Sequence, residues 1–262
     1  MKISLFTKPW KNITADELGA LVRDIGFTSI EFPLRDGYQA QPANAEEDFP
    51  ALAQILAKYG VSICSVAGVP EEAIFAACQK AGVKILRIMA NVKPDVIIAK
   101  GYFTFEDELV AKLESLYPLC KKYGVTIGIQ QHYGAGIFNT MELRHLLDRT
   151  DERYVGGIWD AAHSALSYEV PEQAIDIIYE RLILVNLKNA YIRRYETSDG
   201  LIYKPFFCLA KEGAANWERI VAHLKRKGYQ GDYCMPCEYT DEEKTMEYIR
   251  KDIAYLYELL YD

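Results

Sequence analysis

One short motif occurs three times in the first half of the chain, and it constrains the fold more than any other feature. Lys-Tyr-Gly-Val or Lys-Ala-Gly-Val is found at 58–61, 80–83 and 122–125. Apolar residues at helical spacing precede each copy, and a short β-rich run follows it. A glycine that ends a helix directly before a strand is the junction that each strand–helix unit of an α/β protein requires. The motif therefore predicts a series of such units.

Eight units can be placed along the 262 residues. We expect strands at about 2–6, 29–34, 61–67, 84–91, 125–132, 155–160, 182–188 and 232–238. Helical spacing lies between them, including one long helix over about 104–123. The longest irregular stretch is expected at 189–214. Eight units in one chain of this length predict a (β/α)8 TIM barrel, and no linker divides 1–262, so a single domain is expected.

Composition excludes several classes of partner. Half of the residues are hydrophobic, the net charge is −7, and no block of lysine and arginine stands out. These features argue against binding to nucleic acid or to an anionic membrane surface. No apolar run reaches the roughly 20 residues of a membrane helix, and no signal-peptide core follows Met1. We therefore expect a cytoplasmic protein.

Cys234 and Cys237 have CxxC spacing, but along a strand the two thiols point to opposite faces.

Polar residues gather where the predicted strands end. Side chains alternate along a strand, so the apolar residues that face the helices identify their neighbours as facing the barrel lumen. The polar set selected in this way, together with residues that directly follow strands, is Glu31, Gln130, His132, Asp160, His163, Asn186, Lys188 and Glu238. A single one of them could be a hydrogen-bonded core residue. As a group they predict a ligand site at the C-terminal rim of the barrel, where TIM barrels carry their active sites.

At these positions the chain resembles the xylose-isomerase-like TIM-barrel superfamily of sugar isomerases and epimerases. That family has Glu-x-His, Asp-x-x-His, His-x-x-Lys/Asp and Glu at the ends of strands five to eight. The matching segments here are Gln130-Gln131-His132, Asp160-Ala161-Ala162-His163, Asn186-Leu187-Lys188-Asn189 and Glu238. Lys211–Trp217 also resembles the family's Gly-Glu-Gly-x-x-Asp-Trp stretch, and Tyr229–Gly231 resembles its Gly-Tyr-x-Gly.

The resemblance implies a divalent metal held by Gln130, Asp160, Asn186 and Glu238, with two exchanges in the ligand set. Gln130 stands where the family has glutamate, and Asn186 stands where it has histidine. The set therefore loses one negative charge and its only nitrogen. Oxygen ligands with two charges favour Mg²⁺ over softer ions, and we expect Mg²⁺ or Mn²⁺ to bind weakly or not at all.

The resemblance also implies an enzyme, a sugar isomerase or epimerase acting on a small keto-sugar, polyol or sugar derivative. Glu238 would be the general base, because an amide at position 130 cannot remove a proton. Lys188 or His163 would stabilise the negative oxygen that develops, while Glu31, His132 and Arg193 would contact the carbohydrate. The stretch that contains Arg193 would be a lid or a subunit contact in a homo-oligomer, or a plain surface insertion.

Two other interpretations stay open on the same barrel. The first is a dehydratase or lyase, which needs one base and one acid. The second is a carbohydrate-binding barrel that has lost its metal and does no chemistry.

Overall fold

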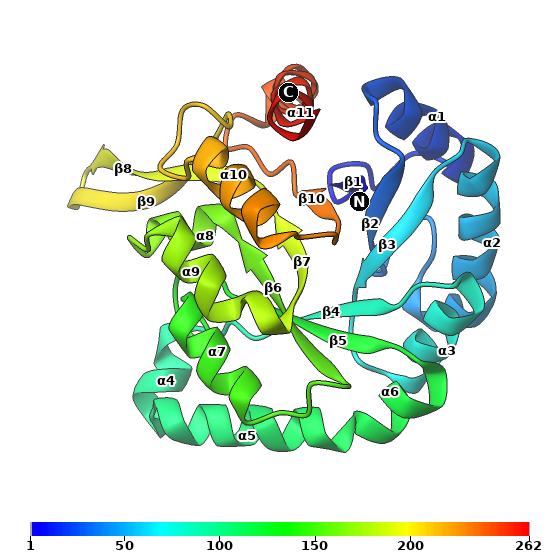
Figure 1. Cartoon of the computed structure of the whole chain (residues 1–262), viewed down its shortest axis with the longest axis horizontal. Coiled ribbons are helices and arrows are strands. Elements are labelled where there is room, and N and C mark those ends of the chain that lie inside the picture. The colour runs from blue at the N-terminus through cyan, green and yellow to red at the C-terminus, as the bar shows by residue number, and fades with distance from the viewer. Residues whose placement is uncertain (1, 262) are drawn as a thin grey trace.

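The computed structural model describes residues 2–261 and contains a closed barrel of eight parallel strands. Around the barrel the strands follow the order β1-β10-β7-β6-β5-β4-β3-β2, and every neighbouring pair is parallel (Figure 1). They are β1 (Ile3–Phe6), β2 (Ser29–Pro33), β3 (Ser62–Ala67), β4 (Ile85–Met89), β5 (Thr126–Gln130), β6 (Val155–Asp160), β7 (Leu182–Asn186) and β10 (Tyr233–Met235). The predicted (β/α)8 barrel is therefore confirmed.

Helices between the strands surround the barrel (Figure 1). They are α1 (Ala15–Ile25), α2 (Ala45–Lys58), α3 (Glu72–Ala81), α4 (Pro94–Lys100), α5 (Tyr102–Ser115), α6 (Tyr117–Tyr123), α7 (Thr140–Asp148), α8 (Ala161–Leu166), α9 (Pro171–Ile178), α10 (Trp217–Lys227) and α11 (Thr245–Tyr261). The glycines of the repeated motif, Gly60, Gly82 and Gly124, have φ angles of 67°, 74° and 64°. Each ends a helix in the left-handed conformation that glycine adopts at least cost, as the motif predicts.

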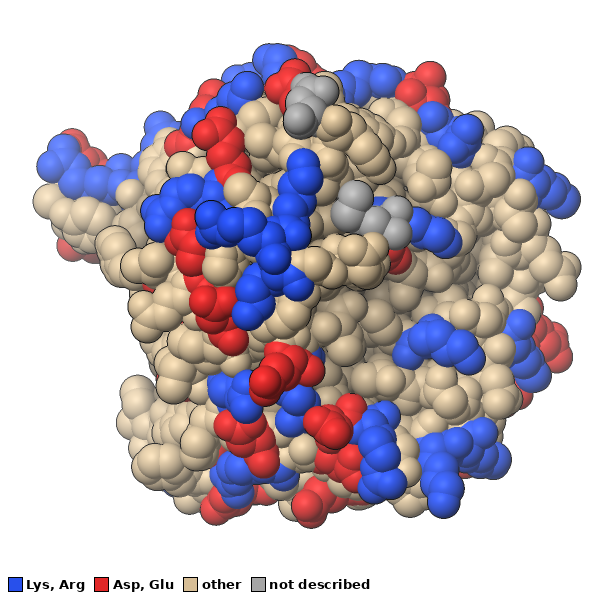
Figure 2. All heavy atoms as spheres, in the orientation of Figure 1, with Lys and Arg blue, Asp and Glu red and all other residues tan. Residues whose placement is uncertain are grey.

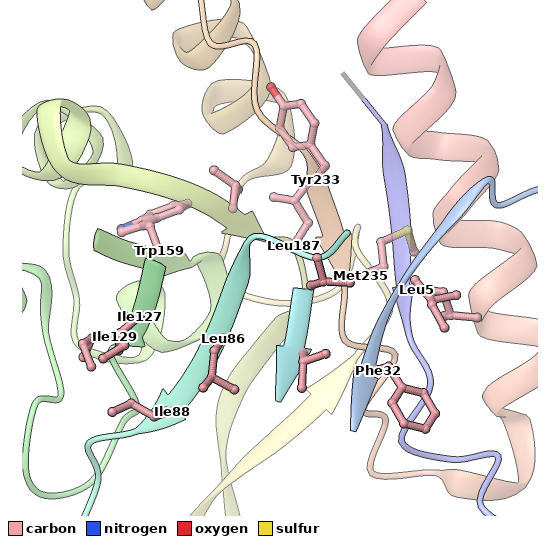
Figure 3. Packing of buried hydrophobic residues seen from close by; sticks show 14 of the residues in the cluster. Leu5, Phe32, Leu86, Ile88, Ile127, Ile129, Trp159, Leu187, Tyr233 and Met235 are labelled. Atoms are coloured by element: carbon pink, nitrogen blue, oxygen red, sulfur yellow. The ribbon is translucent and has the colours of Figure 1, made fainter. Parts of the chain in front are cut away.

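Two apolar layers pack against the strands, one outside the barrel and one inside it. Ile127, Ile129 and Leu187 belong to the large outer cluster between strands and helices, part of which Figure 3 shows. A small inner cluster fills the lumen and includes Phe6 and Leu184. The alternation used to select the rim residues is therefore confirmed on β5 and β7. The inner cluster thus packs apolar side chains into the lumen between the strands.

The stretch expected to be irregular, 189–214, instead contains an antiparallel hairpin. Its strands are β8 (Asn189–Thr197) and β9 (Gly200–Cys208), and they project from the side of the barrel (Figure 1). Aromatic and β-branched residues in both arms favour strands, and the two-residue turn Ser198-Asp199 is followed by Gly200, which has a φ angle of 115°. The prediction was wrong because the hairpin lies outside the barrel and therefore interrupts the strand–helix repeat.

The long helix predicted over 104–123 is also divided, into α5 and α6. Pro118 has no N–H to donate to a carbonyl of the preceding turn, so the helix is interrupted at Leu116. The additional short helix α8 starts immediately after β6, and this sharp turn matters for the site.

On the face drawn in Figure 2, basic and acidic side chains are interspersed. No helix within residues 2–261 is long and apolar enough to cross a membrane.

Candidate active site

The polar side chains selected from strand alternation meet at the C-terminal ends of the barrel strands. A cavity of about 80 Å³ opens there, and its polar lining includes Arg87, Gln130, His132, Asn186, Lys188 and Glu238. Glu31 and Asp160 lie directly behind this lining and are fully buried. His163 packs against His132, with 4.8 Å between the ring centroids. Of the predicted site residues, only Arg193 is elsewhere.

A buried chain of hydrogen bonds runs along one side of the cavity. The Arg87 guanidinium donates to both carboxylate oxygens of Glu31, each at 2.8 Å. Its third nitrogen donates to Oε1 of Gln130 at 2.8 Å. The amide nitrogen of Gln130 then donates to Oδ2 of Asp160 at 2.7 Å. Both ends of the Gln130 amide are therefore bonded within the protein, one to a cation and the other to a carboxylate.

Asp160 is oriented by the sharp turn from β6 into α8. It is the last residue of the strand and also the N-cap of the helix. Its Oδ1 accepts the backbone N–H groups of Ala162 and His163 at 3.0 and 3.1 Å, which satisfies two free donors of the first helical turn. This leaves Oδ2 directed toward Gln130 and Lys188, whose ammonium group is 3.5 Å away.

Lys188 links Asp160 to Glu238. Its ammonium nitrogen lies 3.0 Å from Oε2 of Glu238, while Lys8 donates to Oε1 of the same carboxylate at 2.6 Å. Burial lowers the pKa of Lys188, but Asp160 and Glu238 outweigh that effect and hold the pKa above its usual value. Burial likewise raises the pKa of Glu238, but the Lys188 and Lys8 ammonium groups hold it well below its ordinary range. Lys188 and Glu238 are therefore both charged at neutral pH.

Several buried polar atoms beside the cavity have no hydrogen-bond partner within the described residues. They are Oδ1 of Asn186 and both ring nitrogens of His163. Asn186 is 1 % exposed and His163 is 6 % exposed. Burial lowers the pKa of His132 to about 3 and that of His163 well below its usual value, so both rings are neutral at pH 7. Unpaired buried polar atoms are costly, and their concentration at one rim indicates groups that a polar ligand would satisfy.

Arg87 is the main site residue that our sequence reasoning missed. It lies between Leu86 and Ile88 on β4, and both neighbours belong to the outer core, so strand alternation alone could have placed it in the lumen. Lys8 and Arg35 also line the cavity. They follow β1 and β2 in loops, where no periodic pattern could have indicated their direction.

Arg193 does not line the rim cavity. It lies on β8 of the projecting hairpin, exposed, with its guanidinium 4.7 Å from the ring centroid of Phe206. The base of the hairpin does reach the site through Phe207. The ring of this residue is 5.0 Å from the Lys188 nitrogen and 6.2 Å from the ring of His163.

The four family metal-ligand positions do not fit a divalent ion in this arrangement. The Gln130 oxygen, which would be a ligand, accepts a hydrogen bond from Arg87. Lys188 lies between the carboxylates of Asp160 and Glu238, the two charged ligands. Within residues 2–261, no three histidine, cysteine, aspartate or glutamate side chains are grouped so that they could hold a metal. Three of the four donors, those of Gln130, Asp160 and Glu238, are engaged by cations of the chain itself, and the Asn186 oxygen is left unpaired.

The segment that carries Glu238 is anchored from the outside by Asp252 of α11. Asp252 accepts a hydrogen bond from the Tyr239 hydroxyl at 2.8 Å and one from the Ala210 backbone N–H at 2.9 Å. Asp252 is only 4 % exposed, and burial raises its pKa to about 6. The folded protein therefore takes up a proton here between about pH 4 and pH 6, where an unfolded aspartate is already ionised.

We predict that Asp252→Asn stabilises the protein at neutral pH. Because the folded-state pKa is raised, the contribution of Asp252 is favourable below about pH 4 and is lost as the pH rises to about 6, at up to roughly 1.4 kcal/mol per pH unit. An asparagine carries no charge, and its oxygen can accept from the Ala210 N–H while its NH₂ group donates to the Tyr239 hydroxyl oxygen. Urea unfolding at pH 4, 5, 6 and 7.5 should show an advantage of the variant over the parent that grows with pH. A difference that does not change with pH would contradict the prediction.

Comparisons with known proteins agree with the barrel fold. A family model described as "Xylose isomerase-like TIM barrel" matches residues 20–259. Over 151 residues the chain is 25 % identical to an inosose dehydratase of Lactiplantibacillus plantarum, which covers 54 % of this chain and 49 % of that protein. The chain thus spans about half the length of the curated relatives it matches.

Two solved structures are similar over nearly the whole chain. A D-psicose 3-epimerase from Clostridium cellulolyticum H10, solved with D-tagatose, is 14 % identical with a TM-score of 0.74 over 99 % of both chains. An IOLI protein with a bound zinc atom is also 14 % identical, with a TM-score of 0.73 over 99 % of this chain and 98 % of that one. At these identities the likeness shows a shared fold and leaves the chemistry to be argued from the site.

Proposed function

The chain belongs to the xylose isomerase-like TIM-barrel family, and from this we propose that its rim binds a small carbohydrate with a keto group and moves a proton next to that group. The observation that carries the proposal is the pair formed by Glu238 and Lys188. A carboxylate that lines the cavity lies 3.0 Å from an ammonium group, next to the unpaired amide oxygen of Asn186. A base beside a cation is what proton abstraction next to a carbonyl requires.

Glu238 takes the proton from the carbon beside the carbonyl, and the electron pair of that C–H bond moves toward the carbonyl oxygen. Lys188 stabilises the negative charge on that oxygen by charge and by a hydrogen bond. Return of the proton to the former carbonyl carbon, with transfer of the hydroxyl proton of the first carbon to the oxygen that Lys188 holds, completes a 1,2-isomerisation on one face of the sugar. Return to the same carbon from the other face, an epimerisation, would need a second group, and Gln130 cannot supply one because its amide does not act as a base.

In the free protein Glu238 is a weak base, because Lys8 and Lys188 both bind its carboxylate. A carbonyl oxygen that accepts a hydrogen bond from Lys188 competes with Glu238 for the ammonium group. The pKa of Glu238 then rises toward its usual value as the substrate binds. The same lysine would thus bind the substrate and release the base, which ties proton transfer to an occupied site.

Dehydration is the second candidate function, and the match to inosose dehydratases favours it. After the same proton abstraction, a hydroxyl on the next carbon leaves as water and takes a proton from an acid. The Lys8 ammonium lies on the far oxygen of Glu238 and is a donor in reach of that side of the cavity. Isomerisation and dehydration share the base and the stabilising cation, and they differ in whether this acid is used.

The test is conversion of a panel of ketohexoses and inososes by the purified protein. Nuclear magnetic resonance identifies an isomer, and mass spectrometry detects the loss of water. An isomer from any member of the panel supports the first candidate, and a dehydrated product supports the second. Binding of several members without conversion by either route would contradict both and favour a carbohydrate-binding barrel without chemistry.

A further inference from the structure

We propose that Lys188, supported by Arg87, permanently replaces the divalent metal of this family, so that the rim excludes metal ions and uses its own cation. The inference concerns the binding properties of the site, and it stands whether the reaction is isomerisation, dehydration or neither. The inference rests on the contacts that the Lys188 and Arg87 side chains make.

The first observation is the position of Lys188. Its ammonium group is 3.5 Å from Asp160 and 3.0 Å from Glu238, the two charged residues among the four expected metal ligands. Lys188 is only 7 % exposed. An ion bound by both carboxylates would have to lie against this ammonium group, and two like charges in a buried site repel strongly.

The second observation is that Gln130 fits its cationic neighbour. Its oxygen accepts from Arg87 and its nitrogen donates to Asp160, at 2.8 and 2.7 Å. A glutamate at this position could still accept from Arg87, but it could not donate to Asp160 and would place two carboxylates in contact. The exchange of glutamate for glutamine is thus matched to the presence of Arg87 and Asp160.

The third observation is charge balance. The rim carboxylates Glu31, Asp160 and Glu238 are each paired with Arg87, Lys188 or Lys8. Three carboxylates are matched by three cations, so the paired groups sum to no net charge. A divalent ion added to this set would leave two uncompensated positive charges in a largely buried site.

A simpler interpretation is that these ion pairs only hold the strand ends together. A purely structural network would stabilise the fold, but it would not by itself decide whether the family ligands can bind metal. Metal binding after the ligands are restored is therefore the readout that separates the two interpretations.

The experiment is titration with Mn²⁺, followed by the electron paramagnetic resonance signal of the free ion. Four proteins are compared: the parent, Gln130→Glu/Asn186→His, the same double variant with Lys188→Met, and the double variant with Lys8→Met as a matched control. Lys8 also contacts Glu238, but it is half-exposed and does not touch Asp160. Circular dichroism and thermal unfolding establish that each variant is folded.

We expect the parent and the double variant to bind Mn²⁺ weakly or not at all. Removal of Lys188 should raise the affinity of the double variant by more than about 100-fold, beyond the 10–100-fold that a partner of a metal ligand contributes. Removal of Lys8 should change it much less. Equal affinity with and without Lys188 would overturn the proposal. If the Lys188→Met variant does not fold, the parent still decides the matter, because stoichiometric, chelator-resistant Mn²⁺ binding by the parent would overturn it directly.

Discussion

Glu238→Gln is expected to lower turnover of an identified substrate by roughly 10²–10⁴-fold, the usual size of a general-base contribution. Glutamine has nearly the same shape and keeps one oxygen for Lys8 or Lys188, so substrate binding should change far less than turnover. The measurement is kcat and KM for the parent and the variant under the same conditions. The loss should appear in kcat, because the group removed acts on the proton in flight more than on the bound ground state.

Glu242→Gln is the matched control for this prediction. Glu242 is an exposed glutamate a few residues farther along the chain, and it lines a neighbouring cavity that also includes Glu238. Its exchange removes the same charge from the same side of the molecule, and turnover should stay within a few-fold of the parent. If Glu238→Gln leaves turnover unchanged, another group carries the proton. His163 is then the first residue to replace, because both of its ring nitrogens are unpaired.

Arg87→Met is expected to destabilise the protein by roughly 3–5 kcal/mol, the range measured when one partner of a buried ion pair is removed. Glu31 is fully buried, and Arg87 bonds both of its carboxylate oxygens. Methionine keeps much of the side-chain volume, so the loss reports mainly on the charge that is left alone. Urea unfolding of the parent and the variant at neutral pH measures the difference.

The double variant Glu31→Gln/Arg87→Met provides the control. It removes both charges at once, so it should recover a large part of the stability that the single variant loses. Ser65, which donates to Glu31 at 3.0 Å, can still donate to the glutamine oxygen. A single variant as stable as the parent would show that Glu31 takes up a proton or finds another cation, and that Arg87 is not its essential partner.

Strand alternation places several residues of the candidate site from the amino-acid sequence alone. On β5, β6 and β7 the residues that face the outer core determine which neighbours face the lumen, and Gln130, Asp160 and Asn186 are at the rim as expected. The alternation works because an inner and an outer apolar layer require opposite faces of each strand. Residues outside the strands have no such rule, so the lysine and arginine side chains of the first two rim loops could not be identified in this way.

The sequence could not show how the rim residues pair with one another. Taken alone, glutamine in place of glutamate indicates the loss of a metal ligand. In the structure, Gln130 joins a cation from β4 to a carboxylate at the end of β6. Its partners are 43 and 30 residues away in the chain, and only the closed barrel brings them together. The pattern thus predicted where the candidate site lies, whereas its charge balance depends on contacts between strands.

Deuterium uptake tests most directly the claim that this rim moves a proton with a lysine in place of a metal. The protein is dialysed against a chelator and incubated in D₂O with keto-sugars and inososes, and nuclear magnetic resonance follows the carbon beside the carbonyl. Uptake reports proton abstraction whether the product is an isomer or a dehydrated sugar. We expect uptake that persists in the chelator and is lost in Glu238→Gln. Uptake that appears only after Mn²⁺ or Zn²⁺ is added, or that is unchanged in Glu238→Gln, would contradict the claim.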